Sequence, residues 1–334
     1  MNIIIPMAGM GKRMRPHTLT IPKPLIPVAG KPIVHHLCED LASSTQDKIN
    51  EIAFIIGPNF GKEIEESLIK IATDLGALGK ICYQHEPLGT AHAILAAAES
   101  LTGHCIVAFA DTLFVADFKL DESKDGIIWV NHVSNPEQFG VIKLDSAGQI
   151  TDFIEKPKEF VTDLAIIGIY YFKDGENLRK ELQYLLDNDI KDKGEYQLTN
   201  ALENMKNKGL VFAPAEVKEW LDCGNYQSTV YTNQRVLENK KDSIKIPSSV
   251  TISNSIIIQP CFIGENAIIE NSIIGPHVSI GKNTSVNNSM IKNSIIQDSS
   301  KILDSHFQQS LVGSHVIYAS QFEELSLGDY SVKC

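Results

Sequence analysis

A motif that returns every 17 residues limits the folds open to the C-terminal part of this chain. Residues 254–257 and 271–274 both read Asn-Ser-Ile-Ile, and residues 288–291 read Asn-Ser-Met-Ile. Three short faces per turn, each with one inward aliphatic residue, need a coil of about this length. A disordered segment would not keep its aliphatic residues in phase. We therefore predict a left-handed parallel β-helix of hexapeptide-like repeats over residues 244–334. Its expected inward residues are Ile246, Ile252, Ile257, Ile263, Ile274, Ile280 and Val286.

Residues 1–240 show a different pattern, in which short β-rich runs alternate with stretches of helical spacing. The β-rich runs are residues 2–7, 52–56, 80–84 and 105–110. Helical spacing is clearest at Ile64, Leu68, Ile71 and Leu75. Such alternation predicts an α/β fold with a Rossmann-like, mostly parallel sheet that is covered on both faces. Ligands of these sheets bind beyond the carboxyl ends of the strands, so polar residues directly after a strand become candidates. The polar residues 233–242 are the expected domain boundary.

Composition excludes several classes of protein. The chain of 334 residues has 30 Lys and Arg residues against 41 Asp and Glu residues, a net charge of −11 that argues against nucleic-acid binding. No apolar run approaches the ~20 residues of a membrane span. The N-terminus lacks the pattern of a signal peptide, and the six cysteines lack the spacing of a zinc site or disulfide scaffold. We therefore expect a cytoplasmic protein that binds neither nucleic acid nor membranes.

A glycine-rich, cationic loop follows the first predicted strand. Residues 8–16 read Ala-Gly-Met-Gly-Lys-Arg-Met-Arg-Pro. Glycines let a backbone approach its ligand closely, and successive amides can cradle phosphate oxygens. The loop is neither a Walker loop nor a dinucleotide fingerprint, because no Ser or Thr follows Lys12 and position 14 is Met. By itself it is equally compatible with a structural glycine turn.

The next stretch, residues 21–33, contains four prolines and two lysines. Prolines fix an extended backbone and so hold Lys23 in a defined direction. A rigid surface loop with solvated lysines would also account for this composition. Taken alone, the stretch therefore does not decide between a binding site and an ordinary loop.

Together these two stretches resemble the signature of the sugar-1-phosphate nucleotidylyltransferases, and within them the glucose-1-phosphate thymidylyltransferases. The resemblance rests on Gly-x-Gly-x-Arg-x-x-Pro followed by Pro-Lys-Pro-Leu-x-Pro-Val, and it extends from residue 3 to about residue 225. Further matches follow in the family's order at residues 84–91, 109–112, 139–141, 154–157, 167–170 and 220–224. Three positions depart from the usual pattern: Ala8 replaces Gly, Lys12 replaces Thr, and Thr112 replaces Asn. These departures leave the preferred nucleotide open.

The resemblance implies an enzyme that joins a nucleoside triphosphate to a sugar-1-phosphate and releases pyrophosphate, with dTTP or UTP and glucose-1-phosphate favoured. Its implied catalytic residues are Arg13, Lys23 and Lys156. The nucleotide is expected at Ala8, Gly9, Gly11, Lys12, Gln84, Gly89 and Thr90. The sugar phosphate is expected at Gly140, Glu155, Lys156 and Gly168. Mg²⁺ is expected between Asp111 and Asp222, because hard cations prefer carboxylate oxygens.

The chemistry agrees with the residue types. A sugar phosphate is largely dianionic at neutral pH, so its attack needs no protein base, and the chain shows no Ser/His/Asp or Cys/His constellation. Each assignment also has a structural alternative. Asp111 and Asp222 could cap turns or helices, Glu155 and Lys156 could form a surface pair, and Gln84 could be a satisfied strand residue.

The C-terminal repeat leaves two further functions open. A β-helix after this kind of domain occurs in bifunctional uridylyltransferase/acetyltransferases, for which His277, His306 and His315 would be candidate bases. A non-catalytic regulatory subunit of the same fold is the other alternative, although Arg13, Lys23, Asp111, Lys156 and Asp222 are all present. Exposed ends of a β-helix favour an assembled state, so we expect a homo-oligomer.

Overall fold

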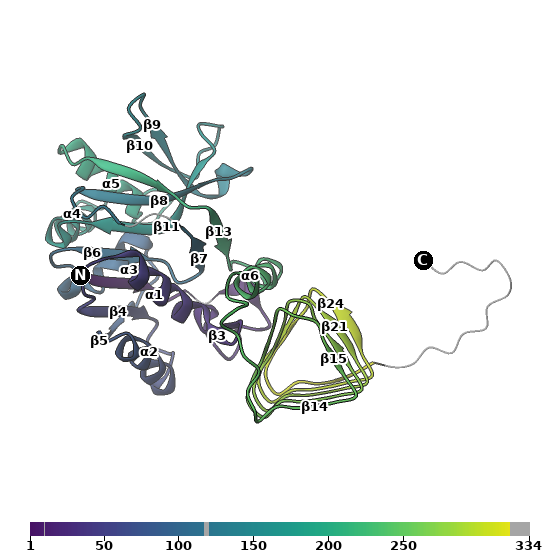
Figure 1. Cartoon of the computed structure of the whole chain (residues 1–334). Coiled ribbons are helices and arrows are strands. Elements are labelled where there is room, and N and C mark those ends of the chain that lie inside the picture. The colour runs from purple at the N-terminus through teal and green to yellow at the C-terminus, as the bar shows by residue number, and fades with distance from the viewer. Residues whose placement is uncertain (10, 117–119, 321–334) are drawn as a thin grey trace. The chain divides into compact units, whose positions relative to one another are not determined.

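The computed structural model describes residues 1–9, 11–116 and 120–320 (Figure 1). Met10 of the glycine-rich loop and residues 321–334 of the predicted β-helix domain therefore lie outside the described residues. The chain divides into two compact units. The first contains Met1–Ile26 and Lys31–Ser228, and the second contains Pro27–Gly30 and the residues from Thr229 onward.

A nine-stranded sheet forms the centre of the first unit (Figure 1). Seven strands lie in the order β10-β9-β11-β6-β1-β4-β5, β8 pairs with β11, and β12 pairs with β8. Their bounds are β1 Asn2–Pro6, β4 Glu51–Ile56, β5 Leu78–Tyr83, β6 Cys105–Ala108, β8 Gly126–His132, β9 Gly140–Leu144, β10 Ile150–Glu155, β11 Leu164–Phe172 and β12 Phe212–Glu216. β1, β4, β5 and β6 run parallel, whereas β11 runs antiparallel to β6, β8 and β9.

Alternate residues of the strands are buried on opposite faces of this sheet. Ile3, Ile4 and Ile5 of β1 are all fully buried, as expected for a strand covered on both sides. On one face, Ile4 belongs to a core cluster with residues of α3, α4 and α5. The helices are α1 Ile33–Ser44, α2 Lys62–Asp74, α3 Thr90–Leu95, α4 Gly175–Asp187, α5 Leu198–Asn207 and α6 Tyr226–Asn239.

Short elements complete the first unit. β7 Thr112–Val115 pairs with β13 Glu219–Asp222 in a separate antiparallel ribbon. The 3₁₀ helices are η1 Lys12–Met14, η2 Lys23–Leu25, η3 Ala98–Ser100 and η4 Pro136–Gln138. The short strand β3 Lys31–Pro32 also belongs to this unit, whereas β2 Pro27–Val28 belongs to the second unit. The predicted α/β class is confirmed, and each predicted β-rich run contains most of a strand of the central sheet.

The second unit contains a β-helix whose coils stack as a triangle (Figure 1). One side consists of β14 Thr251–Ser253, β17 Ile268–Glu270, β20 Ser285–Asn287, β23 Lys301–Leu303 and β26 Ile317–Ala319. The second side consists of β15 Ile256–Ile257, β18 Ile273–Ile274, β21 Met290–Lys292 and β24 His306–Gln308. The third side consists of β16 Cys261–Ile263, β19 Val278–Ile280, β22 Ser294–Ile296 and β25 Leu311–Val312. All neighbouring strands are parallel, which confirms the predicted β-helix.

The Asn-Ser motif has a physical reason in this coil. Asn254, Asn271 and Asn288 turn the corner with φ of 46°, 49° and 46°, a left-handed conformation that Asn tolerates better than most residues. The serines that follow these Asn residues are linked from one coil to the next, since the Ser272 amide donates to Oγ of Ser255 at 3.0 Å. The repeat therefore encodes both a backbone turn and a ladder of hydrogen bonds.

Most of the expected inward residues are buried between the three sides. Ile263, Ile274, Ile280 and Val286 are at most 1% exposed, and Ile246 and Ile257 pack against them. Ile252 is 40% exposed because its strand, β14, lies at the end of its side of the β-helix among the described strands. His277, one candidate acyl-transfer base, has its Nε2 2.5 Å from Oε1 of Glu238 within this unit.

Candidate active site

The carboxyl ends of β1 and β6 open into a cavity of about 310 Å³. Its wall contains residues from the loops that follow β1, β5 and β6. Ligands of mostly parallel sheets bind at this position, beyond the carboxyl ends of the strands. Of the predicted nucleotide residues, this cavity is lined by Ala8, Gly9, Gly11, Gln84, Gly89 and Thr90. Lys23 and Asp111 lie in the same wall. Lys12 instead lines a neighbouring cavity of about 500 Å³ with Thr18 and Phe60.

A second cavity, of about 200 Å³, contains the predicted sugar-side residues. Gly140, Glu155, Lys156 and Gly168 all line it. Thr90 and Phe109 line this cavity as well as the first one. The two cavities therefore adjoin, which is the arrangement that a reaction between two bound substrates needs.

Lys23 and Asp111 form an ion pair in the wall of the first cavity. Nζ of Lys23 lies 2.6 Å from Oδ2 of Asp111. Lys23 is 9% exposed, because η2 turns its stem into the protein, whereas the Asp111 side chain is 37% exposed. A lysine that is buried and paired is pre-positioned for an anion, and the exposed side of the carboxylate stays open to a ligand.

Asp222 reaches the same region by strand pairing. It lies opposite Thr112 in the β7–β13 ribbon, and the Cys223 amide donates to the Asp111 carbonyl at 2.9 Å. Burial, and next the negative charge of Asp111, raise the pKa of Asp222, whereas the Gly224 amide and Lys23 act in the opposite direction. Asp111 and Asp222 thus place carboxylate oxygens in one region, a donor set suited to a hard cation such as Mg²⁺.

Gly224 marks the approach of Arg13 to this carboxylate. A Cβ atom at Gly224 would lie 3.0 Å from both carboxylate oxygens of Asp222 and 3.2 Å from Nη2 of Arg13. The Gly224 amide also donates to Oδ1 of Asp222 at 3.0 Å. The guanidinium of η1 and the carboxylate of β13 are therefore neighbours, although they lie far apart in the sequence.

Gln84 and Gly89 shape the base-side wall. Nε2 of Gln84 lies 3.2 Å from Nδ1 of His92 and 3.5 Å from the Gly89 carbonyl. Gly89 has φ of 120°, and a Cβ atom there would lie 2.4 Å from the Tyr196 carbonyl oxygen. Glycine at position 89 is thus required by the close approach of the Tyr196 backbone, whether or not a base also contacts it.

The sugar-side wall depends on a bent backbone at Lys156. Its φ is 44°, in the left-handed region, and its side chain remains about half exposed, with Nζ 3.7 Å from Oε1 of Glu155. Glu155 is held from the other side, since Oγ1 of Thr199 donates to its Oε2 at 3.4 Å. A Cβ atom at Gly140 would lie 3.2 Å from that same oxygen, so a small residue keeps this wall open.

Several residues of the two cavities were not expected from the sequence. Gln197 is 7% exposed, lines the sugar-side cavity, accepts from Oγ1 of Thr90 at 3.0 Å and donates to Glu195 at 3.0 Å. Glu195 lines the first cavity. The sequence signal for Glu195 is an acidic residue shortly before a helix, and Gln197 gave no signal because its contacts depend on tertiary structure.

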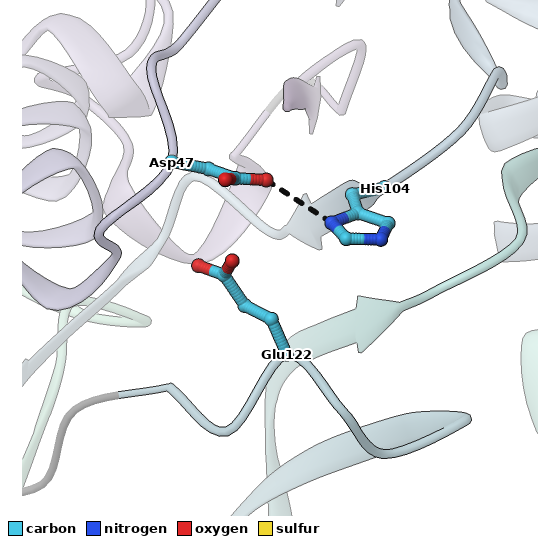
Figure 2. A group of neighbouring side chains, drawn as sticks. All are labelled: Asp47, His104 and Glu122. Atoms are coloured by element: carbon cyan, nitrogen blue, oxygen red, sulfur yellow. Dashed lines mark hydrogen bonds and ion pairs between the residues drawn. The ribbon is translucent and has the colours of Figure 1, made fainter.

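A second group of titratable side chains lies at the opposite edge of the sheet. Asp47, His104 and Glu122 each have a ligand atom within 4.8 Å of the others, and Figure 2 shows them turned toward one another. Asp47 precedes β4 and His104 precedes β6, so they lie at the amino ends of these parallel strands. Nδ1 of His104 pairs with Oδ2 of Asp47 at 3.0 Å. This group is therefore separate from Asp111 and Asp222.

Comparison with known proteins agrees with this geometry. Residues 2–239 match the family model described as nucleotidyl transferase. The chain belongs to the nucleotidyl transferase family. It is 32% identical over 266 residues to the bifunctional protein GlmU of Methanococcus maripaludis, which covers 78% of this chain. The chain spans only 60% of the length of that relative.

Another relative matches along its whole length. Glucose-1-phosphate thymidylyltransferase of Streptomyces antibioticus is 28% identical, and the match covers 99% of this chain and 98% of the relative. Among solved structures, a UDP-glucose pyrophosphorylase in complex with UDP-glucose superposes with a TM-score of 0.58 at 21% identity, over 71% of this chain and 98% of that one. At this identity the superposition shows a shared fold and nothing about function. The nucleotidyl transferases are enzymes. In the described part of this chain, no helix is both long enough and apolar enough to cross a membrane.

Proposed function

We propose that this protein transfers a nucleotidyl group from dTTP or UTP to a sugar-1-phosphate, preferably glucose-1-phosphate, and releases pyrophosphate. The observation that carries the proposal is the Lys23–Asp111 ion pair in the wall of one cavity that adjoins a second cavity lined by Glu155 and Lys156. The full-length match to a glucose-1-phosphate thymidylyltransferase supports these substrates.

The proposed step is a single displacement. An oxygen of the sugar phosphate attacks the α-phosphorus, and the bond from that phosphorus to the bridging oxygen breaks, with its electron pair leaving on pyrophosphate. No proton has to be removed, because the attacking oxygen is already ionised. Lys23 and Arg13 neutralise the triphosphate, and Lys156 holds the sugar phosphate. Positioning and electrostatic stabilisation supply the rate.

Asp111 and Asp222 would hold Mg²⁺ in this proposal. A bound Mg²⁺ neutralises phosphate charge and orients the α-phosphate. The fit rests on the donor set, since hard cations prefer carboxylate oxygens and Asp222 lies beside the negative charge of Asp111. Lys23 already partners one of these carboxylates, so it connects the metal site to the phosphates.

Gln84 would select a pyrimidine base. Its amide offers both a donor and an acceptor, which matches the edge of thymine or uracil. The Gln84 amide does not distinguish thymine from uracil, because the two bases differ only by a methyl group, which forms no hydrogen bond. The choice between dTTP and UTP is therefore left to measurement.

We further propose that residues 1–240 carry the transferase and that residues 244–334 form a separate β-helix domain that serves homo-oligomerisation. The stacked aliphatic side chains on the outer face of its second side support this role. Ile256 and Met290 are 59% and 47% exposed and lie in register with Ile273 between them. Exposed apolar rows of this kind commonly mark a contact surface.

Pyrophosphate release with Mg²⁺ tests the proposal. The assay pairs dTTP, UTP, GTP, CTP and ATP with glucose-1-phosphate and other sugar-1-phosphates. Turnover with dTTP or UTP is expected, together with its loss in Asp111→Asn. Asp74→Asn, which removes an exposed carboxylate of α2, is the matched control and should retain full activity. Failure of every pair would support the regulatory-subunit alternative, and release of thiol from acetyl-CoA would support the bifunctional one.

A further inference from the structure

Lys156 holds a backbone conformation that its residue type disfavours. Its φ of 44° lies in the left-handed region, which costs a residue with a Cβ atom about 1–2 kcal/mol. Such strain persists only where neighbouring groups fix it. The Lys156 amide donates to the Phe139 carbonyl at 3.0 Å, which fixes one side of this peptide.

The other side is fixed by the ammonium of Lys193. Its Nζ donates to the Lys156 carbonyl at 3.0 Å and to the Glu155 carbonyl at 3.3 Å. A charged donor makes a stronger hydrogen bond than a neutral one, so a single side chain bridges both carbonyls of the bent segment. Both residues of that segment, Glu155 and Lys156, line the sugar-side cavity.

The position of Lys193 is itself fixed by a tight turn. Asp192 and Glu195 exchange two backbone hydrogen bonds of 2.9 and 3.0 Å. Between them, Lys193 and Gly194 have φ of 51° and 85°, the two positive values that a type I′ turn requires. Glu195, at the end of this turn, lines the nucleotide-side cavity. The turn therefore connects the walls of both cavities.

We propose that Lys193 is a positioning residue, which holds the Glu155–Lys156 backbone so that Lys156 faces the phosphate of the bound sugar phosphate. This inference rests on the proposed function, in which Lys156 binds that phosphate. Without the two hydrogen bonds, the peptide relaxes toward an extended conformation, and Lys156 and Glu155 leave their places in the cavity. Sugar-phosphate binding weakens, whereas nucleotide binding in the first cavity is unchanged.

Three variants test the role. Lys193→Met keeps the length of the side chain without its charge, and Lys193→Arg restores a cationic donor. Lys173→Met is the matched control, because Nζ of Lys173 also donates to a backbone carbonyl, that of Ser123, at 3.2 Å. We expect K193M to raise KM for glucose-1-phosphate about tenfold with KM for dTTP unchanged. K193R should recover most of this loss, and K173M should behave as the wild type.

Hydrogen exchange of the peptide that contains Lys156 provides a readout without turnover. The Lys156 amide should exchange faster in K193M than in the wild type, K193R or K173M, because its hydrogen bond to Phe139 depends on the fixed conformation. Unchanged exchange, or equal increases in both KM values, would overturn the inference. Absence of turnover in the wild type, together with faster exchange in K193M, would overturn the proposed function and leave the positioning role supported.

Discussion

Single side chains of the site acquire their chemistry from neighbours that the local sequence does not reveal. Asp111 follows a strand and Asp222 ends one, and each by itself could be a capping residue. The pairing of β7 with β13 brings them together, and Lys23 then forms an ion pair with one of them. What distinguishes Asp222 from a surface acid is therefore its partial burial and the negative charge of Asp111 beside it, not its residue type.

Asp222→Asn separates activity from stability at this position. The substitution should lower kcat by at least about 100-fold, because it removes a carboxylate proposed to hold Mg²⁺. The melting temperature should not fall, since the partly buried negative charge beside Asp111 is removed as well. Steady-state pyrophosphate release and thermal unfolding measure the two effects. Full activity in D222N would contradict the metal assignment.

Gly89→Ala tests a close backbone approach. Its Cβ atom would lie 2.4 Å from the Tyr196 carbonyl oxygen, and φ is 120°. We expect a loss of about 2 kcal/mol or more in the free energy of unfolding. Gly209→Ala is the control, because Gly209 has φ of 97° with no atom within 4 Å of the added Cβ. Equal losses of stability in urea unfolding would mean that the Tyr196 contact is unimportant.

At the scale of elements, short turns position residues of the site and form the corners of the β-helix. The type I′ turn from Asp192 to Glu195 places Glu195 in the wall of the first cavity and Lys193 against the Glu155–Lys156 backbone. The 3₁₀ turn η2 buries Lys23. In the β-helix, left-handed Asn residues turn successive corners, so the coil repeats without a loop. The type I′ turn and the Asn corners depend on residues that accept a left-handed backbone conformation.

Asn271→Ala and Asn271→Gly measure the energy of one such corner. Both variants lose the hydrogen bond of 2.8 Å that Asn254 donates to Asn271, but only alanine also opposes the φ of 49°. Asn271→Ala should therefore destabilise the β-helix by about 1 kcal/mol more than Asn271→Gly. Chemical unfolding followed by circular dichroism gives the difference. Identical stabilities would show that backbone strain does not limit this corner.

At the scale of the whole molecule, the outer face of the β-helix is expected to join copies of the chain. Replacing both Ile256 and Ile273 by Lys should dissociate the oligomer, since the two aliphatic side chains are stacked in register. Thr251→Lys with Ser285→Lys adds the same charge on another side and should leave the assembly intact. Light scattering measures the mass. A monomeric wild-type protein would contradict the expectation.

The sequence was sufficient for the fold class and for the repeat of the C-terminal unit. Alternation of β-rich and helical stretches follows from local periodicity, and the 17-residue period follows from the size of a coil. The same information did not show that the coils shorten, although Ser285 pairs with Lys301 only 16 residues later. It also did not show that Ile252 lies in an end coil, because the number of stacked coils is not a local property.

By itself, then, the sequence determined which elements form and which polar side chains follow the strands, because these depend on residues that are close in the chain. Only the tertiary structure decided that Gln197 lines the sugar-side cavity and that Lys193 contacts the backbone of its wall. Their partners, Thr90 for the first and Glu155 and Lys156 for the second, lie 107, 38 and 37 residues away. Hydrogen bonds between such distant residues arise from packing, which a local pattern does not encode.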